Sequence, residues 1–140
     1  MIKHEKRTIL AILFFAGIML TGCMPREYRA NELLKRGTEK VAQQQHVEAI
    51  RIFSQAIRLQ PDFAQAYTFR GSAKFDIGDF AGAMEDYTRA IELNPTYAEP
   101  YDFRGRIHMR MRNIEAACRD FRKAEALGRP GMSDRTRHCP

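Results

Sequence analysis

The sequence predicts an all-α protein, an α-solenoid of three helix-turn-helix repeats preceded by a short leader. A pattern of small and aromatic residues recurs at a fixed spacing, and each recurrence contains two segments with the apolar periodicity of an amphipathic helix. Proline also follows Gln60 and Asn94, near the ends of the first two units. Since the residue before proline disfavours the α conformation, these positions indicate helix ends. The 140 residues are enough for one domain of this kind.

The leader, residues 1–22, has the organisation of a cleaved signal peptide. Basic residues occur in positions 1–8, and an uncharged apolar run of twelve residues occupies positions 9–20. A membrane-spanning helix needs about 18–20 such residues, so this run is short for a span and typical of a signal-peptide core. The next four residues, Leu20-Thr21-Gly22-Cys23, match the order aliphatic, small, glycine, cysteine and resemble the lipobox of bacterial lipoproteins.

This resemblance implies that Cys23 is the lipidation site. A diacylglycerol would be attached to its sulfur, the leader cut off before it, and its amine acylated; no other cofactor is expected. Residues 23–29 would then form the lipidated N-terminus and a linker. Met24 in place of an aspartate favours the periplasmic face of the outer membrane, or the outer face of the cell membrane in an organism with one membrane. An ordinary secretory peptide or a short membrane anchor remains the alternative.

The repeat is marked by three Arg-Gly pairs, at residues 36–37, 70–71 and 104–105, each 34 residues from the next. Alanine follows each glycine after twelve residues, and an aromatic residue follows four later. The pattern resembles the tetratricopeptide repeat, which has a period of 34 residues. It departs from the family at the seventh position, which is arginine in all three units. The units are residues 30–63, 64–97 and 98–131, and residues 132–140 form a tail.

Each unit is expected to form two helices joined by a tight turn. The predicted helices are 30–43 and 47–59, 64–77 and 80–93, and 98–111 and 114–127. The glycine of each unit is small so that its two helices can approach, with the aromatic residue between them. Asp79 and Asn113 are suited to cap the second helices. Gly78 permits the turn in the second unit, where Gln44 and Arg112 stand in the others.

The arginine at the seventh position has a candidate acidic partner in two of the three units. Asp86 and Asp120 lie 16 residues after Arg70 and Arg104, at equivalent positions of their repeats. A salt bridge between the two helices of each hairpin would explain both pairs. The first unit breaks the pattern, because it has Ile52 at the position of the aspartate.

The tail is polar and shows no helical periodicity, so no capping helix is expected after residue 127. The last helix would then be covered either by the tail or by a partner. Cys118 and Cys139 are the two thiols left once Cys23 is acylated, and an oxidising compartment favours a disulfide between them. A buried free thiol and a disordered tail are the alternative. His138 adds too few ligands to these cysteines for a zinc site.

The sequence offers little for catalysis. It has no nucleophile–histidine arrangement and no glycine-rich phosphate loop, and the protein is not expected to be an enzyme. The net charge of +6 is scattered along the helices, without the basic stripe and interleaved aromatics of a nucleic-acid binder. No nucleic acid or metal is expected as a ligand.

The resemblance instead implies a concave groove, lined by the first helix of each repeat, that binds another protein. The groove positions carry Asn31, Leu34, Thr38, Val41, Gln65, Thr68, Ser72, Phe75, Glu99, Asp102, Arg106 and Met109, and a neighbouring position carries Ala42, Asp76 and Arg110. Chaperone-binding members clamp a terminal carboxylate with lysine and asparagine where this chain has Leu34 and Thr38, so that clamp is not expected.

The predicted function is a membrane-anchored adaptor or assembly factor for an envelope complex, in pilus, secretion or outer-membrane assembly. The partner would be another envelope protein, bound in the groove or on the uncapped last helix. The alternative is a protein that binds peptidoglycan or regulates a peptidoglycan enzyme. Phe75 beside Asp76 is the one pair that hints at a glycan site.

Overall fold

The structure, a computed structural model, describes residues 24–137 and 139–140 and is all-helical over them. The helices are α2 (Arg26–Ala42), α3 (His46–Leu59), α4 (Ala64–Asp76), α5 (Phe80–Leu93), α6 (Ala98–Arg110), α7 (Ile114–Ala126) and α8 (Ser133–Thr136). The predictions for the signal peptide and for Cys23 lie outside the described residues. Among the residues described, no helix has the length and apolar character needed to cross a bilayer.

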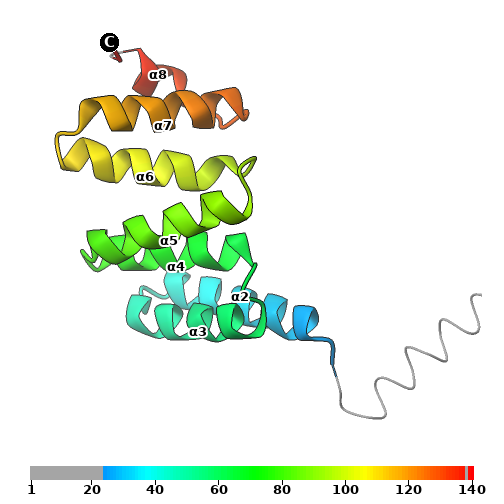
Figure 1. Cartoon of the computed structure of the whole chain (residues 1–140). Helices are drawn as coiled ribbons and strands as arrows, with labels where there is room; N and C mark the ends of the chain where they lie inside the picture. The colour runs from blue at the N-terminus through cyan, green and yellow to red at the C-terminus, as the bar shows by residue number, and fades with distance from the viewer. Residues whose placement is uncertain (1–23, 138) are drawn as a thin grey trace, which may run out of the picture.

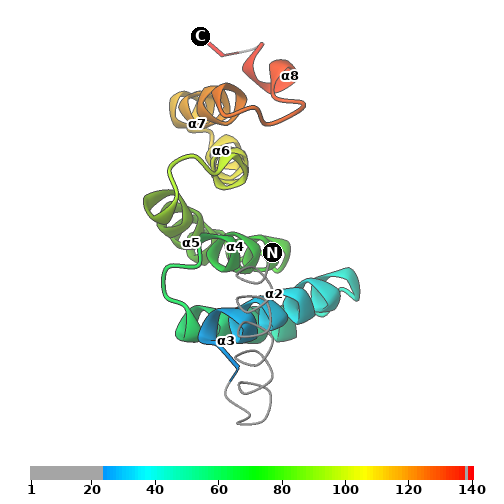
Figure 2. The same ribbon diagram turned by 90° about the vertical axis from the view of Figure 1, so that its right-hand side faces the viewer.

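The helices form three hairpins, α2–α3, α4–α5 and α6–α7, stacked in chain order into a solenoid (Figure 1). Each helix packs against the next along the chain. In addition, α2 contacts α4 and α4 contacts α6, whereas in the part of the chain described α3 does not contact α5, nor α5 α7. The first helices of the repeats therefore lie closer together and line the concave face, as the tetratricopeptide pattern predicts. Figure 2 shows the same stack from the side, with α8 at its end.

Inside each hairpin, the repeat glycine faces the repeat aromatic residue. A Cβ atom built on Gly71 would lie 2.8 Å from Cε1 of Tyr87, and one on Gly105 would lie 2.6 Å from Cε1 of Phe121. Gly37 has the same relation to Phe53, at 2.3 Å. These distances are too short for any larger side chain, so glycine is what allows the aromatic ring to fill the space between the two helices.

The three hairpin turns share one backbone conformation. The φ angle is 59° at Gln44, 84° at Gly78 and 59° at Arg112, all in the left-handed region. The caps expected for the second helices are present: the Asp79 carboxylate accepts a hydrogen bond from the Gly82 amide at 2.9 Å, and Asn113 caps α7 in the same way. The six predicted helices end within one residue of their predicted limits, and five also begin there.

The exception is the start of α2, which begins at Arg26 rather than residue 30. The segment expected to be a linker, residues 23–29, is therefore helical from Arg26 onwards, and Met24 and Pro25 are its described non-helical part. Pro25 precedes the first helical residue, and its carbonyl accepts a hydrogen bond from the Arg29 amide. The predicted start of the first helix at residue 30 is wrong, because residues 26–29 extend the helix as an exposed turn with no apolar side.

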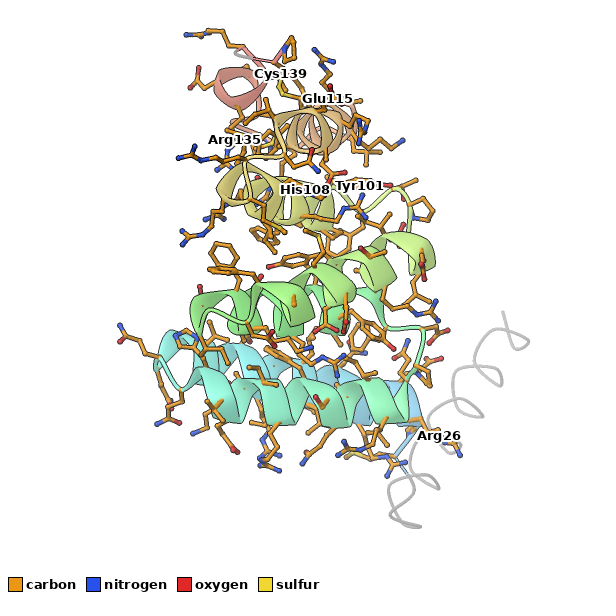
Figure 3. The ribbon with its side chains drawn as sticks, turned by 60° about the vertical axis from the view of Figure 1, so that its left-hand side comes forward. Arg26, Tyr101, His108, Glu115, Arg135 and Cys139 are labelled. Carbon is orange, nitrogen blue, oxygen red and sulfur yellow. A yellow bond between two sulfur atoms is a disulfide. The ribbon has the colours of Figure 1, made fainter. Side chains whose placement is uncertain are left out.

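The tail contains the short helix α8, which the sequence does not predict, and it folds back over α7, which is one of the two covers considered for the last helix. Met132 is 3% exposed and packs in one core cluster with Tyr101 and Phe121. A disulfide joins Cys118 of α7 to Cys139, and their Cα atoms are 5.6 Å apart. Figure 3 shows Cys139 next to α7 at this end of the solenoid. Of the two covers considered for the last helix, the structure thus has the tail.

Candidate partner-binding groove

Two buried ion pairs lie behind the groove and hold the hairpins together. Nε and Nη2 of Arg70 donate to the two carboxylate oxygens of Asp86, at 2.9 and 2.6 Å. Arg104 and Asp120 repeat this fork, at 2.9 and 2.8 Å. The salt bridges predicted from the 16-residue spacing are confirmed.

Each arginine also reaches the preceding repeat. Nη1 of Arg70 donates to Ser54 of α3, and Nη1 of Arg104 donates to Thr88 of α5. The hydrogen bonds to the aspartates raise the pKa of both arginines. Each guanidinium group thus links its own helix to two neighbouring helices. These arginines therefore stabilise the fold and are not available to a partner.

The groove positions of the first repeat offer few free side chains. Asn31 and Thr38 donate hydrogen bonds to carbonyls of their own helix, those of Glu27 and Lys35. Leu34 and Val41 pack against the core of the first hairpin. This part of the groove is uncharged, as the sequence indicates, and its apolar side chains are partly used in packing.

Several predicted positions further along are buried or paired. Thr68 is fully buried and donates to the carbonyl of Ala64. Asp102 is 3% exposed and accepts a hydrogen bond from Nη1 of Arg135 at 2.7 Å. Glu99 accepts one from Arg129. The structure therefore does not offer Thr68 and Asp102 to a partner, and Gln65 lines a separate hollow with Tyr97.

The predicted positions that do come together are Ser72, Phe75 and Arg106. With three further residues they line a hollow of about 200 Å³, completed by Asp76, Tyr87 and Phe103. The Tyr87 hydroxyl donates to Ser72 at 3.3 Å, and burial raises the pKa of Tyr87 to about 12. The hollow thus combines aromatic walls with one guanidinium and one carboxylate.

A larger hollow of about 500 Å³ adjoins it toward the C-terminus. We call it the arginine hollow; it is lined by Phe75, Arg106, Met109, Arg110, Phe121, Asp134 and Arg135. Phe75 and Arg106 belong to both hollows, so the two adjoin each other. Arg135 reaches this wall from α8 (Figure 3). Sequence reasoning did not include Phe121 or the tail in the groove, because Phe121 is a packing position of the repeat and the tail is expected only as a cover of the last helix.

The described residues show no arrangement suited to bind a metal, since no group of three or more histidine, cysteine or acidic side chains comes together among them. His46 and His108, at packing positions of the repeat, are both half-buried. Burial lowers the pKa of His108, against the attraction of Asp120, whose carboxylate lies 3.9 Å away.

Comparison with known proteins agrees with this geometry. A family model described as tetratricopeptide repeat matches residues 34–98. The repeat resemblance extends over that segment, and the fold of the described residues is similar to that of tetratricopeptide-repeat domains. No match was found among curated proteins. Among solved structures, the first such domain of Spaghetti (RPAP3), bound to the HSP90 peptide SRMEEVD, is 26% identical with a TM-score of 0.75, over 79% of this chain and 90% of that one.

Two other solved structures are similar. The domain of Arabidopsis OM64 is 21% identical, with a TM-score of 0.75 over 80% of this chain and 93% of that one, which bears on the fold alone. MamA is 28% identical, with a TM-score of 0.67 over 71% of this chain and 58% of that one. The tetratricopeptide fold is a scaffold for protein–protein interaction, and the groove described above is where such a role would reside in this chain.

Proposed function

We propose that this chain is a lipid-anchored adaptor of the bacterial cell envelope, whose groove binds a segment of another envelope protein during pilus, secretion or outer-membrane assembly. The anchor is the lipid on Cys23, on the periplasmic face of the outer membrane or the outer face of a single membrane. The observation that carries the binding role is the pair of adjoining hollows on the concave face, which share Phe75 and Arg106. The similar domain of Spaghetti is bound to a peptide, which supports this mode.

Site-specific photocrosslinking in cells tests the proposal. A photoreactive amino acid placed at Phe75 should crosslink the full-length protein to one or a few envelope proteins, because the side chain lies in both hollows. The matched control is the same amino acid at Arg58, an exposed position of α3. Crosslinks of equal yield at both positions, or none at Phe75, would contradict a binding groove.

The alternative, binding of peptidoglycan, rests on Phe75 and Asp76, which both line the smaller hollow. A sugar ring needs a free aromatic face to stack on. The guanidinium of Arg106 lies 5.5 Å from the centre of the Phe75 ring, and Phe80 packs against that ring at a steep angle. The ring is therefore largely occupied, which favours a protein ligand. Cosedimentation with purified peptidoglycan is the direct measurement, and strong retention would favour the alternative.

A further inference from the structure

Two arginines of α6 lie against aromatic rings on the concave face. The guanidinium of Arg106 is 5.5 Å from the ring centre of Phe75 and 5.8 Å from that of Phe103, and that of Arg110 is 4.7 Å from that of Phe80. Such contacts are attractive and restrict the orientation of the guanidinium plane. The N–H groups of the stacked guanidinium, which point outward in its plane, remain free to donate hydrogen bonds.

These two arginines lack the carboxylate partners that their neighbours have. Arg104, Arg129 and Arg135 are each within 4.0 Å of an aspartate or glutamate oxygen. Over residues 24–137 and 139–140, no salt bridge involves Arg106 or Arg110, and both are exposed. Their charges are therefore balanced by solvent and not by the protein.

The acidic residues nearby do not cancel this charge in the arginine hollow. Asp134 is paired with Arg137 at 3.1 Å, and Arg135 is paired with Asp102. Asp76 lines the smaller hollow, where it faces His46 at 3.5 Å. The larger hollow thus has an excess of two positive charges, beside the apolar surface of Met109, which is 45% exposed.

We propose that the arginine hollow binds an extended acidic segment of the partner protein, with carboxylates on Arg106 and Arg110 and an apolar side chain against Phe75 and Met109. This deepens the proposed function and rests on it. Bidentate guanidinium–carboxylate pairs are among the stronger hydrogen-bonded contacts of proteins, and an arginine held in place by stacking loses less freedom on pairing. A basic segment would face repulsion at the same place.

Fluorescence anisotropy with the purified full-length protein tests the charge preference. The probe is a short fluorescein-labelled peptide of alternating glutamate and leucine, and its counterpart has lysine in place of glutamate. We expect the glutamate peptide to bind at least tenfold more tightly. Arg106→Ala should weaken that binding about tenfold, the equivalent of 1.4 kcal/mol, Arg106→Lys less, and Arg58→Ala not at all. Added salt should weaken the wild-type binding.

Equal binding of the two peptides, or equal effects of Arg106→Ala and Arg58→Ala, would overturn the proposal. The proposal would also be overturned if the protein bound anionic vesicles of phosphatidylglycerol in an Arg106-dependent way and did not bind the glutamate peptide. The ligand would then be a lipid headgroup.

The crosslinking experiment separates this proposal from the proposed function. If Phe75 crosslinks to an acidic segment of a partner and Arg106→Ala abolishes the crosslink, both the adaptor role and the acidic ligand are supported. If the crosslinked segment is neutral or basic, the adaptor role stands and the acidic ligand is wrong. If Phe75 crosslinks to no protein, the adaptor role itself fails.

Discussion

The three hairpin turns require a left-handed residue, but only one of them has glycine. Gln44 and Arg112 adopt a φ of 59°, and both are exposed. A left-handed conformation costs an L-residue about 1–2 kcal/mol. Glycine avoids this cost because it has no Cβ, but it loses more freedom on folding, which cancels part of the gain. We predict that Arg112→Gly raises the free energy of unfolding by about 0.5–1 kcal/mol, as measured by urea denaturation.

The control is the reverse change in the middle turn. A Cβ at Gly78 would meet no atom within 4 Å, so Gly78→Ala tests the backbone alone and should destabilise the protein. If Arg112→Gly is destabilising, or Gly78→Ala is neutral, the turns are not strained in the way described.

The contact between Gly71 and Tyr87 sets how closely α4 and α5 approach. Because a Cβ at Gly71 would lie 2.8 Å from the Tyr87 ring, Gly71→Ala should destabilise the protein by about 1–3 kcal/mol through overpacking. Thermal melts followed by circular dichroism measure this loss. In a Tyr87→Ala background the same change should cost clearly less, because the two residues are coupled. An undiminished loss would mean that the ring is not the obstacle.

Tyr87 also makes stability depend on pH at the alkaline end. Burial raises its pKa to about 12, and that of a tyrosine in an unfolded chain is about 10. Between these values the folded protein keeps a proton that the unfolded chain has lost, so stability falls as the pH rises through this window. One such group contributes a slope of up to about 1.4 kcal/mol per pH unit.

Tyr87→Phe should therefore flatten the loss of stability between about pH 10 and 12, as measured by urea denaturation at several pH values. Part of the slope should remain, because burial also raises the pKa of Tyr97 to about 12. An unchanged slope in the variant would show that Tyr87 titrates normally in the folded protein.

At the scale of single elements, the tail acts as the cap of the solenoid. Met132 fills the end of the last hairpin, and the disulfide between Cys118 and Cys139 closes a loop with a sequence separation of 21. Cys139→Ser should lower the free energy of unfolding by about 3 kcal/mol, and Met132→Ala by about 2–5 kcal/mol. Ser133→Ala, at an exposed position, is the control.

The bond itself is measured by mass spectrometry of the non-reduced protein. If both cysteines react with an alkylating agent under oxidising conditions, the disulfide between them is absent. Because Asp134 and Arg135 line the arginine hollow, loss of the disulfide should also weaken binding of the glutamate peptide. A Cys139→Ser protein that is less stable but binds as well as the wild type would show that the tail caps the fold without shaping the site.

The sequence predicts those helices in which apolar residues recur along one side. Six helices could be located because each has several turns facing the core. The helix α8 has four residues, too few to show a period, and the first turn of α2, residues 26–29, is exposed all round. Neither leaves a pattern that periodicity can detect.

The sequence predicts which helix face forms the groove, but not which single side chains on that face are free. Equivalent positions in the repeat place Thr68, Ser72 and Asp102 on the same face. Whether each is free depends on distant residues: Asp102 is covered because Arg135, 33 positions later, pairs with it. Such a contact depends on where the tail folds, which the repeat pattern does not contain.

At the scale of the whole molecule, the two proposed attachments lie at opposite ends of the solenoid. The described chain begins at α2, directly after Cys23, and ends beyond α8 (Figure 1). The arginine hollow is formed by α4, α6, α7 and the tail, toward the far end. A lipid on Cys23 would therefore tether the α2 end and leave the hollow toward the other end of the solenoid.

This separation predicts that anchoring and binding can be lost independently. Cys23→Ser should release the protein from the membrane fraction or leave it as an unprocessed precursor, because each buried methylene of an acyl chain contributes about 0.8 kcal/mol of membrane affinity. The measurement is cell fractionation combined with metabolic labelling by a fatty-acid analogue. Purified Cys23→Ser protein should bind the glutamate peptide as tightly as the wild type. Arg106→Ala protein should instead carry the fatty-acid label and bind the glutamate peptide about tenfold more weakly. A wild-type protein that carries no fatty-acid label would end the lipoprotein proposal, and would leave the groove as the sole attachment to be explained.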